Sequence, residues 1–177
     1  MSVDKAFLSG IVIEPLDARH DRAAFSCGET RIDNYLKISA RSHVKEDLVQ
    51  MYVAVRGDVQ VLGYYALGAH ALDTSSLPPE ILKKMPPWPA ISAFYLSMVG
   101  VDTRFQGKGL GTLLVADAFK KCITAADLVG GSFIVLDALN DDAARMYRRL
   151  GFTELPSQPR RMIIGMKQVR SAARKAP

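Results

Sequence analysis

Apolar residues recur along this chain with two different periods, and these periods predict its helices and strands. In residues 32–44 an apolar residue occurs every fourth position, which is typical of an amphipathic helix, and Thr30 is the predicted N-cap. The same spacing over residues 110–126 predicts a long helix. A third helical pattern, residues 143–150, ends at Gly151.

Shorter apolar runs bounded by turn residues predict strands. Gly57 and Asp58 supply the turn of a hairpin, and the nearly continuous apolar run of residues 93–101 predicts a strand buried on both faces. Five prolines in residues 77–89, around a short helical turn at 80–85, predict a surface loop. The predicted strands are residues 11–13, 50–55, 59–69, 93–101, 132–137 and 162–166.

The order of these elements predicts the fold class. Helices and strands mix without strict alternation, and the early hairpin requires antiparallel pairing, so we expect an α+β domain with a mixed sheet. The length of 177 residues fits a single domain, residues 1–177, with a core of about residues 11–167. A basic tail, residues 168–177, is expected to be solvated and frayed.

Charge and hydropathy exclude some functions and favour others. No apolar run approaches the roughly 20 residues that a membrane-spanning helix needs, and the N-terminus lacks the pattern of a signal peptide. We therefore expect a cytoplasmic protein that does not interact with membranes. The net charge of +5 favours polyanionic partners without specifying one.

A glycine-rich segment joins the predicted strand 93–101 to the long helix. Glycines let the chain turn tightly and let backbone N–H groups approach a ligand, and a helix N-terminus favours phosphate groups. The segment is not a P-loop, because Lys108 precedes Gly109 and not a Ser or Thr. Nor is it a dinucleotide fingerprint, because position 112 is Thr.

The segment does match the pattern Gln/Arg-x-x-Gly-x-Gly/Ala, and it resembles the acetyl-CoA pyrophosphate motif of the GNAT superfamily of N-acetyltransferases. Asn140, Tyr147 and Leu150-Gly151-Phe152 lie where that family places further signature residues. The resemblance implies the GNAT fold, with a mixed, mostly antiparallel central sheet flanked by helices, and acetyl-CoA as cofactor. The cofactor contacts that it implies are Met98, Val99, Val101, Gln106, Gly107, Lys108, Gly109, Leu110, Gly111, Thr112, Asn140 and Tyr147. It implies no metal.

The resemblance also implies the chemistry, in which a neutral amine attacks the thioester. A backbone N–H at or near Val99 would stabilise the thioester oxygen, and Tyr147 would supply a proton to the departing thiolate. Tyr147 also lies on an apolar stripe and is alternatively a core residue, and Asn140 is alternatively a helix N-cap. No general base is evident, since Asp102 and Glu154 flank strands and are expected to be solvated.

A narrower resemblance concerns Phe25-x-Cys27-Gly28, Asp33-x-Tyr35-Leu36 and Ala40, which are similar to the N-terminal signature of GNAT toxins from type II toxin–antitoxin systems. Those enzymes acetylate the α-amine of aminoacyl-tRNA and block translation. Their usual partner is a ribbon-helix-helix antitoxin, and a homodimer is plausible from the family. The expected tRNA contacts are Lys83, Lys84, Arg145, Arg148, Arg149, Arg160 and Arg161, each of which is alternatively a solvated surface residue.

Two alternatives stay open from the sequence. The chain is alternatively a GNAT enzyme that acetylates a small-molecule amine or a protein N-terminus. In the other alternative it is a non-catalytic module that binds acyl-CoA or a protein partner.

Overall fold

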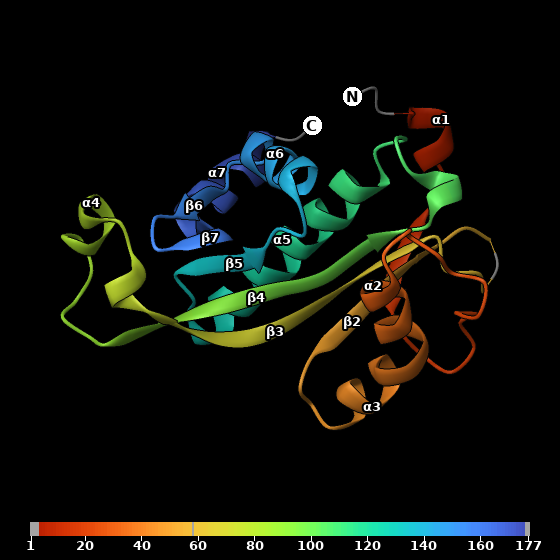
Figure 1. Ribbon diagram of the computed structural model, residues 1–177, viewed down its shortest axis with the longest axis horizontal. Coiled ribbons are helices and arrows are strands. Elements are labelled where there is room, and N and C mark those ends of the chain that lie inside the picture. Colours follow the sequence, from red (N-terminus) through yellow and green to blue (C-terminus); the bar gives the residue numbers. More distant parts are fainter. Residues whose placement is uncertain (1–3, 58, 176–177) are drawn as a thin grey trace. The chain divides into compact units, whose positions relative to one another are not determined.

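The computed structural model describes residues 4–57 and 59–175 (Figure 1). Its strands follow the order β1-β2-β3-β4-β5-β7-β6 in one sheet. Of the pairs with a described register, β4–β5 is parallel, whereas β1–β2, β2–β3, β5–β7 and β6–β7 are antiparallel. The predicted α+β class with a mixed, mostly antiparallel sheet is therefore confirmed. The strands are β1 (Val12–Pro15), β2 (Gln50–Val55), β3 (Gly63–Asp73), β4 (Ala90–Val101), β5 (Phe133–Asp137), β6 (Thr153–Leu155) and β7 (Gln158–Gly165).

The helices are partly those that the periodicity predicts. None of those described is both long and apolar enough to cross a membrane. The α-helices are α1 (Lys5–Leu8), α2 (Thr30–Asn34), α3 (Ala40–Lys45), α4 (Pro79–Leu82), α5 (Leu110–Val129), α6 (Asp141–Arg149) and α7 (Met166–Lys175). The 3-10 turns are η2 (Thr74–Ser76) and η3 (Thr103–Phe105), and the π-helical turn η1 (Tyr35–Ser39) joins α2 to α3.

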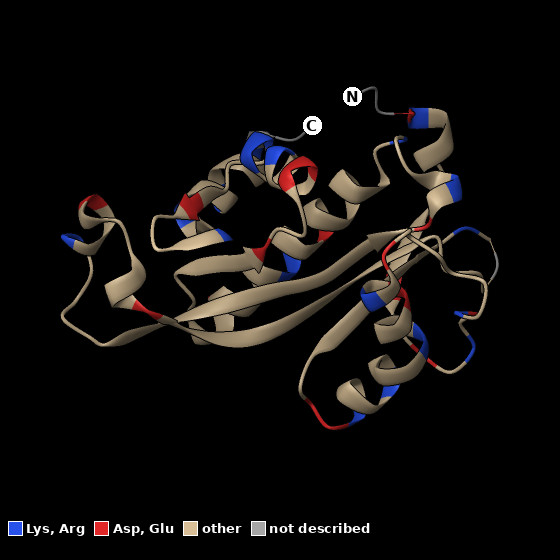
Figure 2. Cartoon of the chain, in the orientation of Figure 1, with Lys and Arg blue, Asp and Glu red and all other residues tan. Residues whose placement is uncertain are grey.

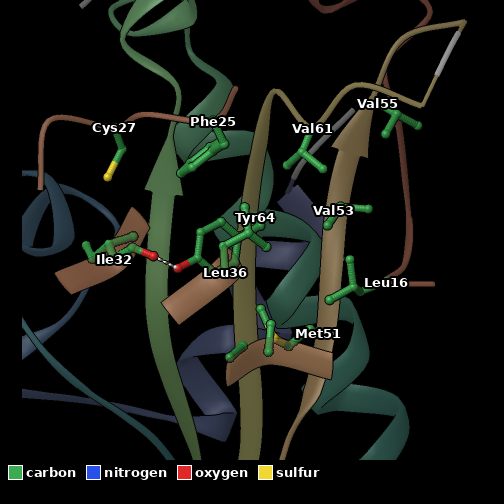
Figure 3. Close-up of a cluster of buried hydrophobic side chains, with 12 residues drawn as sticks. Leu16, Phe25, Cys27, Ile32, Leu36, Met51, Val53, Val55, Val61 and Tyr64 are labelled. Carbon is green, nitrogen blue, oxygen red and sulfur yellow. Dashed lines mark hydrogen bonds between the residues drawn. The ribbon is translucent and has the colours of Figure 1, made fainter. Parts of the chain in front are cut away.

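The chain forms two compact units. The first comprises Met1–Gly68 and Leu96–Ala118, and the second comprises Ala69–Tyr95 and Phe119–Pro177. In the first unit, the apolar stripe predicted over residues 32–44 packs on the face of β2 and β3 (Figure 3). Tyr64 of β3 is fully buried there, and its hydroxyl donates a hydrogen bond of 2.7 Å to the Ile32 carbonyl.

One hydrophobic cluster of the second unit lies on a single face of its strands. Leu72, Ala93, Val135 and Ile163 from four different strands pack together, and Leu77 and Met85 of the proline-rich segment lie against them. Most other residues of the segment are exposed, so it is a surface loop, as predicted, although its helical turn is shorter and begins earlier than residues 80–85.

Several sequence predictions are wrong in detail. Thr30 is not an N-cap but the first residue of α2, and the capping residue Glu29 makes no side-chain bond to the helix. The third strand begins at Gly63 and not at Val59, and the predicted turn includes position 58, which lies outside the described residues. The tail is not frayed through residue 175, because α7 continues from β7 and buries Val169 completely.

Candidate functional site

The glycine segment forms the connection from β4 to α5 in the first unit, as its sequence predicts. Gly107 and Gly109 have φ values of 74° and 93°, in the region that other residues enter only with strain. A Cβ on Gly107 would meet nothing within 4 Å, so one side of the loop is open. Because α5 begins directly after it at Leu110, unpaired N–H groups and the positive end of the helix dipole lie at the loop. This geometry fits a phosphate or pyrophosphate group.

Gln106, the first residue of the motif, uses its side chain to hold the loop in place. Its Nε2 donates hydrogen bonds of 2.9 Å to the carbonyls of both Val101 and Cys27. The bond to Val101 ties the middle of the connection back to the end of β4. The motif position therefore shapes the loop, and its backbone is the part left for a ligand.

Asp102 is the residue for which the sequence expectation was most wrong. It directly follows β4 and is only 1 % exposed. Its carboxylate accepts hydrogen bonds from the Ser26 N–H at 3.2 Å and from the N–H, Nε and Nη2 of Arg104 at 3.1, 2.8 and 2.9 Å. Burial alone would raise its pKa, but the Arg104 and Ser26 hydrogen bonds outweigh it, so the pKa lies below its usual value. Glu154, in contrast, is exposed as expected and pairs with Arg148.

A second carboxylate continues this network to α2. Asp33 is buried and accepts the Cys27 N–H at 2.8 Å and the Ser26 hydroxyl at 3.1 Å. The Thr103 N–H donates in turn to the Ser26 carbonyl at 2.8 Å. The Ser26–Cys27 segment is thus held between α2 and the beginning of the glycine connection. Sequence reasoning missed this role, because the segment's contacts with Asp102 and Gln106 join residues more than 70 positions apart.

The middle of β4 carries a backbone irregularity at the predicted catalytic position. Met98 has a φ of 53°, which is unusual for a residue other than glycine. The described pairing with β5 covers Ala93 to Tyr95 and ends before this point. Ser97, Met98 and Val99 are all partly exposed, so this half of the strand is not buried on both faces as expected. A strand that is irregular where its described pairing with β5 has ended can direct backbone N–H groups toward a ligand.

Asn140 and Tyr147 belong to the second unit, on α6. The Asn140 side chain accepts the Ala143 N–H at 2.9 Å, so it is the helix N-cap. Tyr147 packs edge-on against Phe152 with ring centroids 5.7 Å apart, and it is 6 % exposed. Burial raises the pKa of Tyr147 to about 12. The Tyr147 hydroxyl has no hydrogen-bond partner among the described residues. Every fully buried side-chain oxygen of those residues has a partner, so this hydroxyl is not fully buried and reaches the surface.

The basic residues expected to contact tRNA all lie in the second unit, and they divide into those that pair with an acidic residue and those that do not. Figure 2 shows Lys and Arg on α6 and α7, with acidic residues on α6 as well. Arg145, Arg148, Arg160 and Arg161 pair with acids, and Arg161 holds Asp137 through two hydrogen bonds of 2.8 and 2.9 Å. Lys83, Lys84 and Arg149 are exposed and have no acidic partner among the described residues.

The three histidines differ in their surroundings. His20 is buried and lies 2.8 Å from a Glu14 oxygen, and His43 lies 3.0 Å from the Tyr35 hydroxyl. Burial, with Arg161 nearby, lowers the pKa of His70, so that histidine is neutral at physiological pH.

A glycine loop at the N-terminus of a long helix, preceded by a strand that is irregular where its parallel pairing ends, is the arrangement that the resemblance to acyl-CoA-dependent acyltransferases implies. A family model described as an acetyltransferase (GNAT) domain matches residues 47–154. The chain belongs to this GNAT acetyltransferase family.

Two relatives make the comparison more specific. A protein of Sinorhizobium fredii named "Probable toxin TacT" is 37 % identical over 169 residues, which cover 90 % of this chain and 93 % of the relative. A "tRNA-acetylating toxin" of Mycobacterium tuberculosis is 34 % identical over 152 residues, which cover 85 % and 89 %.

Solved structures resemble the chain over nearly its whole length. A tyrosine-to-phenylalanine mutant of KacT has a TM-score of 0.88 at 27 % identity and covers 93 % of this chain and 99 % of its own. AtaT complexed with acetyl-methionyl-tRNAfMet has a TM-score of 0.85 at 28 % identity and covers 92 % and 98 %. A tyrosine-to-phenylalanine mutant of AtaT, bound to acetyl-CoA and to the C-terminus of the antitoxin AtaR, has a TM-score of 0.78 at 25 % identity and covers 93 % and 99 %.

Proposed function

We propose that this protein transfers the acetyl group of acetyl-CoA to the α-amine of an aminoacyl-tRNA and thereby blocks translation. The observation that carries the proposal is the loop at Gly107 and Gly109, whose conformation and position at the start of α5 suit the pyrophosphate of CoA. The similarity to a tRNA-acetylating toxin and to AtaT with an acetylated tRNA supports the choice of acceptor.

The roles of the residues follow from their surroundings. The loop N–H groups would hold the pyrophosphate, and an N–H at or near Val99 would stabilise the thioester oxygen as negative charge develops on it. Because the pKa of Tyr147 is raised to about 12, its hydroxyl is protonated at neutral pH. It can therefore donate a hydrogen bond to the departing thiolate. An α-amine with a pKa of about 8 is partly neutral at pH 7 and needs no strong base. This agrees with a sequence in which no general base is evident.

The test is acetyl transfer from radiolabelled acetyl-CoA to a charged tRNA pool, with deacylated tRNA as control. We expect label on charged tRNA alone, and sequencing of the labelled species would give the amino-acid specificity. Equal labelling of both pools, or of neither, would exclude the α-amine as acceptor. Transfer to a small amine instead would leave the enzyme class intact and overturn the tRNA assignment.

The role of Tyr147 is tested separately by Tyr147→Phe. General acid catalysis contributes about 100-fold or more, so kcat is expected to fall by at least that factor while the affinity for CoA stays unchanged. Tyr64→Phe is the matched control, because it removes a hydroxyl that is bonded within the core. It should lower stability and leave kcat of the folded enzyme unchanged. A similar kcat for both variants would exclude Tyr147 as the proton donor.

We also propose that a ribbon-helix-helix antitoxin neutralises the enzyme and that the enzyme is a homodimer. The support is the AtaT structure with the antitoxin AtaR and the family resemblance. Light scattering of the purified protein would give its mass in solution, and growth arrest that is relieved by co-expression of a neighbouring antitoxin gene would identify the partner.

A further inference from the structure

The short N-terminal helix α1 lies against the glycine loop in the first unit. The Asp4 N–H donates a hydrogen bond of 3.2 Å to the Lys108 carbonyl, in the middle of the loop. Phe7 stacks on Phe105, with ring centroids 5.7 Å apart and an angle of 19° between the planes. A segment about 100 positions away in sequence therefore contacts the loop through both backbone and side chain.

The Phe7 ring also faces the Lys108 ammonium group. The Lys108 Nζ lies 4.8 Å from the centroid of Phe7 and 5.9 Å from that of Phe105. Both distances are within the range of a cation–π interaction. Lys108 has no acidic partner among the described residues, so the rings hold its ammonium group without neutralising the charge.

Arg56 fixes α1 in this position. It directly follows β2, and its Nη2 donates to the carbonyls of Ala6 and Ser9 at 3.2 and 3.0 Å, as well as to that of Phe7. Its guanidinium carbon lies 5.0 Å from the Phe7 ring centroid. The last carbonyls of a helix lack hydrogen-bond donors within the helix. Arg56 supplies the donor for these carbonyls and thereby ties α1 to the end of β2.

We propose that Phe7 is a positioning residue for the cofactor loop. Its ring holds the Lys108 ammonium beside the loop, where the charge strengthens binding of the phosphate groups of CoA. The proposal rests on the assignment of this loop to CoA. It adds that Phe7, which lies outside the family motif, contributes to cofactor binding. Phe7 touches no reacting atom, and its effect is exerted through Lys108 and Phe105.

The experiment measures the affinity for CoA by calorimetry at low salt. The variants are Phe7→Ala, Lys108→Met and the double variant. A cation–π contact and one charge beside a phosphate make us expect each single change to weaken CoA binding about 5-fold. If Phe7 acts through Lys108, the double variant binds no more weakly than about the weaker single variant, whereas independent roles would multiply the two losses.

Two control variants separate positioning from general damage. Phe7→Tyr keeps the ring and is expected to keep the wild-type affinity. Lys5→Ala removes an exposed positive charge from the same helix, where it has no contact with the loop, and should also leave affinity unchanged. With saturating acetyl-CoA, kcat of Phe7→Ala should equal that of the wild type, and only KM for acetyl-CoA should rise.

The outcomes distinguish this proposal from the assignment beneath it. Wild-type protein that fails to bind CoA would refute the assignment of the loop. Wild-type protein that binds CoA while Phe7→Ala binds equally well would refute the role of Phe7 alone. Multiplicative losses in the double variant, or a fall in kcat, would refute action through Lys108. Because calorimetry needs no acceptor, the result holds whichever amine is acetylated.

Discussion

Replacing Asp102 by Asn changes one atom of a buried carboxylate and should destabilise the protein far more than an exposed change of the same kind. Asn keeps a single acceptor oxygen, and its NH2 group then faces a donor, either the Ser26 N–H or the Arg104 side chain. The variant therefore loses acceptor capacity and charge together, at a place where water does not replace them.

The expected size follows from the individual hydrogen bonds. A buried N–H left without its acceptor costs about 1–3 kcal/mol, and the remaining N–H loses a charged acceptor, which adds roughly 1 kcal/mol. The Arg104 side chain is 49 % exposed, so its ion pair is screened by solvent and adds little. We expect Asp102→Asn to lower the free energy of unfolding by about 2–4 kcal/mol at pH 7.

The effect should also depend on pH in a defined direction. The folded-state pKa of Asp102 is lowered, so its contribution is fully present above the unfolded-state pKa of about 3.9 and is lost as pH falls through the folded-state value. The difference between wild type and variant should therefore be constant from pH 5 to 7 and shrink below pH 4.

Urea unfolding at several pH values measures both quantities, and Asp127→Asn is the matched control. Asp127 pairs with Arg170 at 2.7 Å with 60 % of its side chain exposed, so its loss should cost less than about 1 kcal/mol. An Asp102→Asn effect as small as that of the control would refute the reasoning. So would a difference from wild type that persists unchanged in acid.

Three further predictions concern the same unit and the cysteines. Gly109→Glu places a charged side chain at a position with a φ of 93°, so calorimetric CoA binding should be lost with an unchanged circular dichroism spectrum, and retained binding would displace the loop assignment. Gly100→Ala brings a Cβ to 2.8 Å from Ile32 Cγ2 and 3.2 Å from Tyr64 Cε1, and should destabilise by about 1–3 kcal/mol in urea. Gly68→Ala, whose Cβ would meet atoms no nearer than 3.4 Å, is its control and should cost clearly less. Burial raises the pKa of Cys27 and Cys122 to about 12, so neither thiol should react with Ellman's reagent at pH 8 until urea is added, and rapid reaction of native protein would contradict their burial.

The sequence predicted those parts of the fold whose signals are local. β2 and α5 begin where predicted, because the apolar periodicity of each element, and the glycines before α5, are signals that lie within a few residues of one another. Asn140 is a helix N-cap, the alternative role that its position allowed. The elements that were missed have little periodicity of their own. β6 has three residues, and α7 buries only Met166 and Val169 within its described side chains. Their structure depends on packing against distant residues, which one sequence does not reveal.

The candidate site shows the same division. The conformation of Gly107 and Gly109 is a local property and was predictable, as was the helix that follows. The contact of Asp102 with Ser26 is not local, so a carboxylate next to a strand was taken for a solvated one. The irregularity at Met98 leaves no trace in the sequence either, because a methionine with positive φ is held there by the surrounding fold.

These contacts change what the two family motifs mean. Cys27 and Asp33 lie in the signature that resembles the toxins, yet they act here by bracing the connection to α5. Gln106 opens the cofactor motif, but its side-chain amide binds two carbonyls of its own chain. A motif residue such as Gln106 can therefore be retained for the shape of the loop and not for a side-chain contact with the ligand. A change at Gln106 should therefore act by releasing the carbonyls of Val101 and Cys27. Its effect on CoA affinity should be non-additive with that of Asp102→Asn and additive with that of Tyr147→Phe.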